Sequence, residues 1–162
     1  MKKIICLISV LMLLSVLPSY SQIMEENKDE NKFDPARNPF ADLKETILQT
    51  GQTGKRILLD VGGEWCIWCH RLDAFIEDHK EIKDFIQENF VKLKVNYSPE
   101  NKNEKFLAQY PKVAGYPHIF ILDKDGKFLF SKNTGELEKE KSYDADKIIA
   151  FLKEWAPAKD KK

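Results

Sequence analysis

Apolar side chains recur with helical spacing in several stretches of this 162-residue chain. Residues 39–50 carry them at i, i+3, i+7 and i+8, which predicts a helix with one buried face. Gly51 and Gly54 follow and are expected to end it. A second helical stretch is expected to begin at about Cys66 and, after a break, to continue to about residue 86. Two further helices are predicted, over residues 104–110 and from the capping residue Asp144 to Trp155.

Four other stretches have the patterns of strands. Residues 56–61 form a short, nearly continuous apolar run, as in a strand buried on both faces. Residues 90–97 alternate between apolar and polar side chains. Residues 118–123 and 127–131 are separated by Lys-Asp-Gly, which predicts a hairpin. The resulting order, α-β-α-β-α-β-β-α, indicates an α/β fold with a mixed central sheet flanked by helices on both sides.

The N-terminus has the pattern of an export signal. Lys2 and Lys3 precede an apolar run over residues 4–17, which is shorter than the roughly 20 residues of a membrane-spanning helix. We therefore expect cleavage after Ser21 and a protein exported to the periplasm or another extracytoplasmic compartment of a bacterium; an uncleaved anchor is the alternative. The predicted organisation is a signal peptide over 1–21, a flexible tether over 22–38, one domain over 39–158 and a charged tail over 159–162.

Charge and cysteine content narrow the function. The chain has 26 basic and 26 acidic residues, so nothing favours binding to nucleic acid. We expect a monomer. Loss of Cys6 with the signal peptide would leave two cysteines, Cys66 and Cys69, which can close only a very small ring. Such a ring stabilises a fold little, which favours a chemical role over a structural one.

The spacing of Cys66 and Cys69 suits disulfide chemistry. At the start of a helix, two residues separated by this spacing lie on one face, within disulfide distance. The unpaired N–H groups of the first turn and the helix dipole would favour the thiolate of Cys66, the attacking form. Cys69, one turn further in, would be more buried and would resolve the mixed disulfide.

The chain resembles the thioredoxin superfamily over residues 40–156. A buried strand leads into Gly-Gly-Glu-Trp-Cys-Ile-Trp-Cys, with Trp65 directly before the first cysteine, and Asp60 lies six residues before Cys66. The resemblance implies that Asp60 takes the proton of Cys69. A carboxyl group in an apolar strand has a raised pKa and can accept a proton near neutral pH. Lys92 matches a lysine that partners this carboxylate in the family.

Further along, Gly115-Tyr116-Pro117 matches the family's cis-proline loop. The resemblance implies a cis bond before Pro117, opposite the cysteine helix, with the backbone of Tyr116 free to pair with an extended substrate segment. Trp65, Tyr116 and Pro117 are the predicted substrate-binding residues.

Some positions depart from thioredoxin itself and would tune the redox potential. Ile67 and Trp68 stand between the cysteines where thioredoxin has Gly-Pro, and the W-C-x-W-C form is similar to exported thioredoxin-like proteins. His118 follows the proline, and an imidazolium there would further favour the thiolate. His70 is expected on the helix face near the site.

The predicted function is therefore thiol–disulfide exchange with protein substrates, as a reductase or isomerase. It needs no dissociable cofactor and no metal, and a membrane-embedded electron donor is its expected partner. Three alternatives remain at this point. The first is a client-binding module without turnover. The second is a c-type haem protein, because Cys66 to His70 reads C-x-x-C-H. The third is a zinc site that would draw on Cys66, Cys69 and His70, and on His79 or His118.

Overall fold

The structure is a computed structural model that describes residues 32–158. The predicted signal peptide (1–21), most of the predicted tether and the tail (159–162) lie outside the described residues. Among residues 32–158, no helix has both the length and the apolar character needed to cross a membrane.

A four-stranded mixed sheet forms the centre of the fold, with the strand order β2-β1-β3-β4. β1 pairs in parallel with β2 on one side and antiparallel with β3 on the other, and β4 pairs antiparallel with β3. The predicted α/β class and mixed sheet are confirmed. The strands are β1 (Arg56–Gly62), β2 (Phe90–Asn96), β3 (His118–Leu122) and β4 (Phe128–Asn133).

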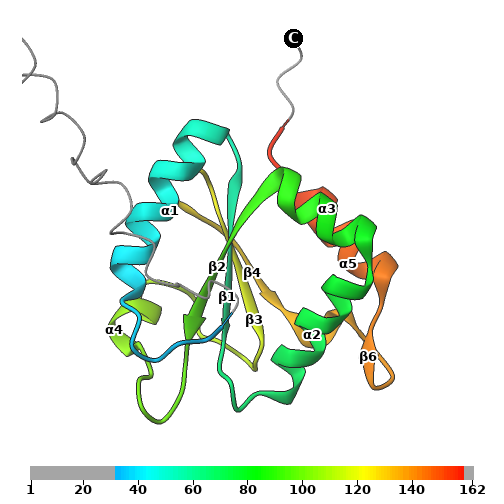
Figure 1. The fold of residues 1–162 in the computed structure, drawn as a ribbon, viewed down its shortest axis with the longest axis horizontal. Helices are drawn as coiled ribbons and strands as arrows, with labels where there is room; N and C mark the ends of the chain where they lie inside the picture. Colours follow the sequence, from blue (N-terminus) through cyan, green and yellow to red (C-terminus); the bar gives the residue numbers. More distant parts are fainter. Residues whose placement is uncertain (1–31, 159–162) are drawn as a thin grey trace, which may run out of the picture.

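Helices cover both faces of this sheet (Figure 1). One face carries α1 (Pro39–Thr53) and α4 (Glu104–Leu107). The other carries α2 (Ile67–Asp78), α3 (Lys80–Asn89) and α5 (Ala145–Trp155). The single predicted stretch after Cys66 is thus two helices, which meet at His79. A short 3-10 helix, η2 (Thr134–Leu137), and a small hairpin, β5 (Glu138–Lys139) and β6 (Ser142–Tyr143), precede α5.

The alternation of β1 decides which of its side chains can take part in a site. Ile57, Leu59 and Val61 belong to the apolar cluster that includes side chains of α1 and α4, whereas Leu58 belongs to the cluster of α2, α3 and α5. Because side chains alternate along a strand, Asp60 and Gly62 share the face of Leu58. Asp60 is therefore directed towards the α2 side of the sheet, although its strand is otherwise apolar.

The predicted apolar face of α1 is buried only in part. Leu43 and Ile47 pack against the core, whereas Phe40 and Leu48 are 50% and 64% exposed. Thr46 and Thr50 are buried instead, since their hydroxyls donate to backbone carbonyls and leave no unsatisfied polar group. Helical spacing alone did not identify these threonines as interior positions.

The end of α1 gives a stability prediction with a matched control. The helix continues through Gly51 and ends at Gly54, whose φ of 71° is left-handed. Gly54→Ala is expected to lower the free energy of unfolding by about 1 kcal/mol, because a Cβ is unfavourable in that conformation. Gly51→Ala, in the helix with no atom near its Cβ position, is expected to raise it by about 0.5–1 kcal/mol. Urea unfolding measures both, and equal effects would contradict the assignment of the cap.

The segment before α1 is not a free tether where the structure describes it. Phe33 is 1% exposed, and Asn38 caps α1 by accepting from the amides of Phe40 and Ala41. The segment, dark blue in Figure 1, runs from the start of α1 towards the end of β1. The flexible tether predicted over 22–38 is thus incorrect for residues 33–38, because a single phenylalanine among polar residues fixes the chain.

Candidate active site

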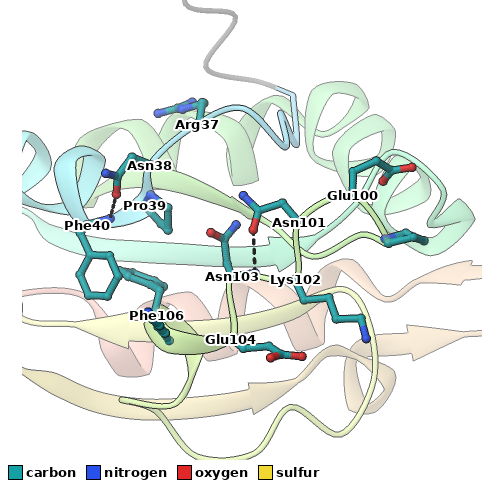
Figure 2. Close-up of a pocket in the computed structure, with 12 residues that line it drawn as sticks. Arg37, Asn38, Pro39, Phe40, Glu100, Asn101, Lys102, Asn103, Glu104 and Phe106 are labelled. Atoms are coloured by element: carbon teal, nitrogen blue, oxygen red, sulfur yellow. Dashed lines mark hydrogen bonds between the residues drawn. The ribbon is translucent and has the colours of Figure 1, made fainter.

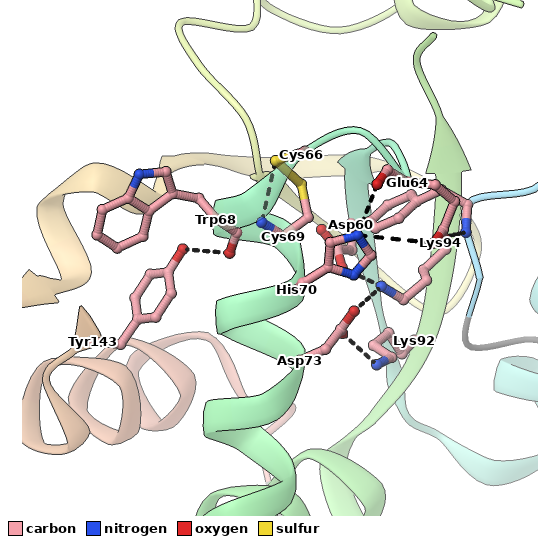
Figure 3. A network of polar contacts seen from close by, with 11 residues as sticks. Asp60, Glu64, Cys66, Trp68, Cys69, His70, Asp73, Lys92, Lys94 and Tyr143 are labelled. Carbon is pink, nitrogen blue, oxygen red and sulfur yellow. Dashed lines mark hydrogen bonds and ion pairs between the residues drawn. A yellow bond between two sulfur atoms is a disulfide. The ribbon is translucent and has the colours of Figure 1, made fainter. Parts of the chain in front are cut away.

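Cys66 and Cys69 form a disulfide at the start of α2 (Figure 3). Their Cα atoms are 5.2 Å apart. Cys66 is the N-cap residue of the helix, and its Sγ accepts from the backbone N–H of Cys69 at 3.1 Å. The helix therefore directs a donor at the very sulfur that the sequence predicted as the attacking atom, which favours its thiolate once the disulfide is reduced.

Both cysteines are buried, and Cys66 is more buried than the sequence suggested. Cys66 is 4% exposed and Cys69 is 1% exposed. Cys66 nevertheless lies just below the surface, since its neighbours Trp65 and Ile67 are 56% and 59% exposed. Cys69 lies deeper, at the α2 face of β1, where a Cβ on Gly62 would come within 2.5 Å of its Sγ. Only glycine at this position lets the sulfur approach the strand.

A network of two acids and two lysines lies beneath the disulfide (Figure 3), and two of its members, Asp60 and Lys94, are buried. Lys94 pairs with Asp60 across β1 and β2, and its Nζ is 3.4 Å from Asp60 Oδ2. The same Nζ is 2.6 Å from Asp73 Oδ2 on α2, and Lys92 Nζ is 3.4 Å from Asp73 Oδ1. The lysine that partners Asp60 is therefore Lys94, and the prediction of Lys92 is wrong. Parallel pairing places residue 94, not 92, opposite Asp60.

Burial raises the pKa of Asp60 above its ordinary value of 3.8, and the positive charge of Lys94 partly opposes this shift. The neighbouring carboxylate of Asp73 adds to the rise. Oδ1 of Asp60 is buried and accepts no hydrogen bond from the described residues. A carboxylate in this setting is a stronger base than one in water, as the sequence predicted.

Two lysine variants test the corrected pairing. Lys94→Met is expected to raise the pKa of Asp60 further and to cost about 3 kcal/mol of unfolding free energy at pH 7, because it leaves buried carboxylates without their cation. Lys92→Met is the matched control and should have a smaller effect on both, since Lys92 contacts Asp73 and acts on Asp60 only through its charge, without direct contact. Carbon-13 NMR of the Asp60 carboxyl in the oxidised protein measures the shift. A larger effect from Lys92→Met would contradict the pairing.

The predicted substrate-binding residues lie together beside the disulfide. The Tyr116–Pro117 peptide bond is cis. The ring of Tyr116 makes an edge contact with Trp65 and stacks on Tyr97, while Trp65 Nε1 donates to the carbonyl of Tyr97 at 2.7 Å. Within residues 32–158, the backbone N–H and carbonyl of Tyr116 make no hydrogen bond, whereas the carbonyl of Pro117 accepts from Thr134. The backbone N–H and carbonyl of Tyr116, next to the cysteines, are thus free to form hydrogen bonds with another chain.

Two of the residues expected to tune the redox potential, Trp68 and His70, lie next to the disulfide. The ring of Trp68 lies under the guanidinium of Arg71 and against Tyr143, and Nε2 of His70 is 2.8 Å from the carbonyl oxygen of Glu64.

His118 does not act as predicted. It is 2% exposed, and its Nε2 is 2.8 Å from Ser131 Oγ. Burial lowers its pKa, and the distant charge of Glu136 opposes this only in part. An imidazole with a lowered pKa is neutral at pH 7, so the expected imidazolium, and its favourable effect on the thiolate, are not supported.

Sequence reasoning missed three residues of the site: Phe33, Asp73 and Lys94. Asp73 follows Cys69 by one helical turn, which could have placed it on the same face. Lys94 could have been found only from the strand register. Phe33 had no signal beyond being a large apolar residue in a polar segment.

The alternative metal and haem sites do not fit this geometry. His79 stacks on Phe75 at the far end of α2, and His118 is buried in β3. Among the described residues, no three metal-binding side chains come together. Both sulfurs are joined in the disulfide and Cys69 is 1% exposed, so neither is available in this structure for a thioether bond to haem.

Comparison with known families agrees with this arrangement. Residues 43–145 match the family described as "Thioredoxin-like domain". The chain belongs to this thioredoxin-like family. The resemblance stated from the motifs is thereby confirmed.

Individual relatives of this thioredoxin-like protein include enzymes of disulfide exchange. It is 34% identical over 94 residues to "Disulfide bond reductase DsbH" of Chlamydia pneumoniae, a match that covers 52% of this chain and 56% of the relative. It is 29% identical over 100 residues to "Thiol:disulfide interchange protein DsbD" of Actinobacillus pleuropneumoniae, covering 61% of this chain and 17% of that protein. The match thus spans about half of one relative and a small part of the other.

Solved structures show the same fold. A disulphide isomerase from Xylella fastidiosa superposes with a TM-score of 0.66 at 22% identity, covering 75% of this chain and 94% of that one. The C-terminal domain of DsbD from Neisseria meningitidis, in the oxidised form, gives a TM-score of 0.52 at 19% identity, covering 73% and 96%. These likenesses establish the architecture of the chain.

Proposed function

We propose that this protein is a thiol–disulfide oxidoreductase that acts on disulfides of other proteins. One observation carries the proposal: a cysteine pair at the start of a helix lies above a buried carboxylate with a raised pKa. The first cysteine has an N–H donor at its sulfur, and the second is packed against the strand that holds the carboxylate. A purely structural disulfide requires neither feature.

The first step is attack by the Cys66 thiolate on a substrate disulfide. A bond forms between Cys66 Sγ and one substrate sulfur, the substrate S–S bond breaks, and the other substrate sulfur leaves as a thiolate. The N–H of Cys69 stabilises the attacking thiolate. The product is a mixed disulfide at the surface end of α2.

The second step releases the substrate. Cys69 loses its proton to the Asp60 carboxylate, and its thiolate attacks Cys66 Sγ. The mixed disulfide breaks, the Cys66–Cys69 bond forms, and the substrate sulfur leaves as a second thiolate. Two electrons have then passed to the substrate. The positive charge of Lys94 limits the rise in the pKa of Asp60, so that this carboxyl group can still ionise near neutral pH.

Substrate would bind along the loop before β3. The unpaired N–H and carbonyl of Tyr116 can each take one backbone hydrogen bond from an extended segment. The exposed ring of Trp65 borders an open, largely apolar hollow of about 710 Å³ that also includes Tyr97 and Pro35. This hollow can receive a side chain flanking the substrate cysteine. Pro117 holds the loop in place next to the pair.

The direction of transfer and the compartment are part of the proposal. One relative is named a disulfide bond reductase and another a thiol:disulfide interchange protein, which supports reduction or isomerisation. The pattern over residues 1–21 supports export. Outside the reducing cytoplasm the oxidised pair needs an electron source, so we propose a membrane-embedded donor that returns it to the dithiol.

Insulin reduction by dithiothreitol tests this function. The wild-type chain without residues 1–21 should accelerate precipitation of the insulin B chain, and a Cys66→Ser, Cys69→Ser double variant should not. Equal rates would reject catalysis and favour a client-binding module. The reduction potential of the pair then gives the direction: a value near about −270 mV indicates a reductant and one near about −120 mV an oxidant.

A further inference from the structure

The segment of residues 33–37 is fastened across the active site at three points. The N–H of Phe33 donates to Glu64 Oε1, in the loop before Cys66, at 2.8 Å. Asn101 Nδ2 donates to the carbonyl of Pro35 at 2.8 Å, and the Arg37 guanidinium pairs with a carboxylate of α1. Arg37 and Asn38, together with the loop of Glu100 to Asn103, line an open hollow of about 620 Å³ (Figure 2). The segment is therefore held by the loop before Cys66, by the loop that contains Asn101 and by α1.

The ring of Phe33 closes the inner side of the redox site. Its Cζ and the Sγ of Cys69 both adjoin Gly62, where a Cβ would lie 2.9 Å from the first and 2.5 Å from the second. Its centroid is 3.8 Å from Nζ of Lys94. The side chain of Lys94 has no exposure, and Cys69 has almost none. Phe33 thus contacts both the resolving cysteine and the cation beside Asp60, and it comes from outside the predicted domain.

We infer that Phe33 is a positioning residue for the proposed exchange reaction: it excludes water from Cys69 and Lys94, and so determines the pH range over which Cys69 gives up its proton. The inference rests on the proposed function. In the resolving step the proton passes from Cys69 Sγ to the Asp60 carboxylate while the new thiolate attacks Cys66 Sγ. Phe33 takes no part in bond making and acts only by keeping this space dry.

The charged groups around this space come from each element packed on it. β2 contributes Lys92 and Lys94, α2 contributes Asp73, and Tyr143 of β6 is close enough for its own pKa to respond to Asp60. Glu64 faces the backbone of Phe33 from the loop. All of these groups remain when the side chain of Phe33 is shortened. Removal of its ring should therefore admit water while leaving the charges in place.

The experiment replaces Phe33 by Leu, Val and Ala and titrates Asp60 by carbon-13 NMR in the oxidised protein, where the cysteines do not titrate. Thermal unfolding first confirms that each variant is folded. We expect the Asp60 titration to move down by at least about one pH unit in Phe33→Ala, because hydration favours the carboxylate. Phe33→Leu, the control that keeps an apolar cover, should move it by less than about 0.3 unit. The shift in Phe33→Val should lie between these two values. If the alanine variant does not fold, Phe33→Val is compared with Phe33→Leu in its place.

Two activity measurements link this titration to the reaction. The acidic limb of the pH–rate profile for insulin reduction should shift with the Asp60 titration, and iodoacetamide should label Cys69 faster in reduced Phe33→Ala than in the wild type. If the wild type is active but the variants titrate like it, the inference about Phe33 is overturned while the proposed function stands. If the wild type reduces no insulin, the proposed function fails and the inference fails with it.

Discussion

Cys69→Ser is expected to stop turnover and to leave the protein covalently joined to its substrate. Without the second sulfur, the mixed disulfide at Cys66 has no internal thiolate to break it. Cys66→Ser should also stop turnover, with no adduct, because Cys69 is 1% exposed and packed against Gly62. Each variant should lose at least about 100-fold in insulin reduction, since each removes a reacting atom.

Mass spectrometry under non-reducing conditions distinguishes the two variants. With a peptide disulfide as substrate, the Cys69→Ser protein should gain the mass of one peptide half, and dithiothreitol should remove it. The Cys66→Ser protein should keep its own mass. The opposite pattern would exchange the roles of the two cysteines, and an adduct on both would show that Cys69 is reached without passing Cys66.

Asp60→Asn is expected to slow the reaction by about 10- to 100-fold at pH 7, through loss of the group that takes the proton of Cys69. The variant should recover as the pH approaches the ordinary thiol pKa of about 8.5, where solvent can take over. Asp78→Asn, at the exposed end of α2, is the control and should not change the rate. A pH–rate profile of Asp60→Asn that parallels the wild type would contradict the role of Asp60.

The same substitution should stabilise the protein at neutral pH. Burial raises the pKa of Asp60 above 3.8 in the folded state, so the folded protein binds this proton more tightly than the unfolded chain does. That favourable contribution is complete below pH 3.8 and is lost as the pH rises through the folded pKa. Asp60→Asn avoids the loss, and Lys94 keeps Asp73 as a partner. Its melting temperature should exceed that of the wild type at pH 8, and the difference should vanish near pH 4.

The proposed role of Asp60 as a base depends on its burial, which is unfavourable for the charged carboxylate. A buried carboxylate that the fold would hold more easily as an amide is the group that the reaction needs as a base. The protein therefore gives up some stability at neutral pH to hold Asp60 in the apolar sheet. Stability and activity should accordingly change in opposite directions for Asp60→Asn, which a merely structural acid would not show.

The sequence by itself determined the main order of helices and strands and the cysteine pair at a helix start, because both depend on local spacing. The buried acid Asp60 and the cis bond before Pro117 were implied by the resemblance to the thioredoxin superfamily, which rested on the position of Asp60 before Cys66 and on the Gly-Tyr-Pro segment. The α/β class followed because helices and strands alternate along the chain. For Cys66, Cys69 and Asp60, the position in the sequence was sufficient to place them at one end of β1.

Only the tertiary structure decided the partners. Lys94 rather than Lys92 adjoins Asp60 because of the register between two strands separated by α2 and α3. The pKa of His118 is lowered because other elements bury it, and the threonines of α1 face inward because carbonyls are available to their hydroxyls. Phe33 covers Cys69 from a segment with no pattern of its own. Pairing, burial and charge depend on which residues meet after folding, and the spacing of residues along one chain does not contain that information.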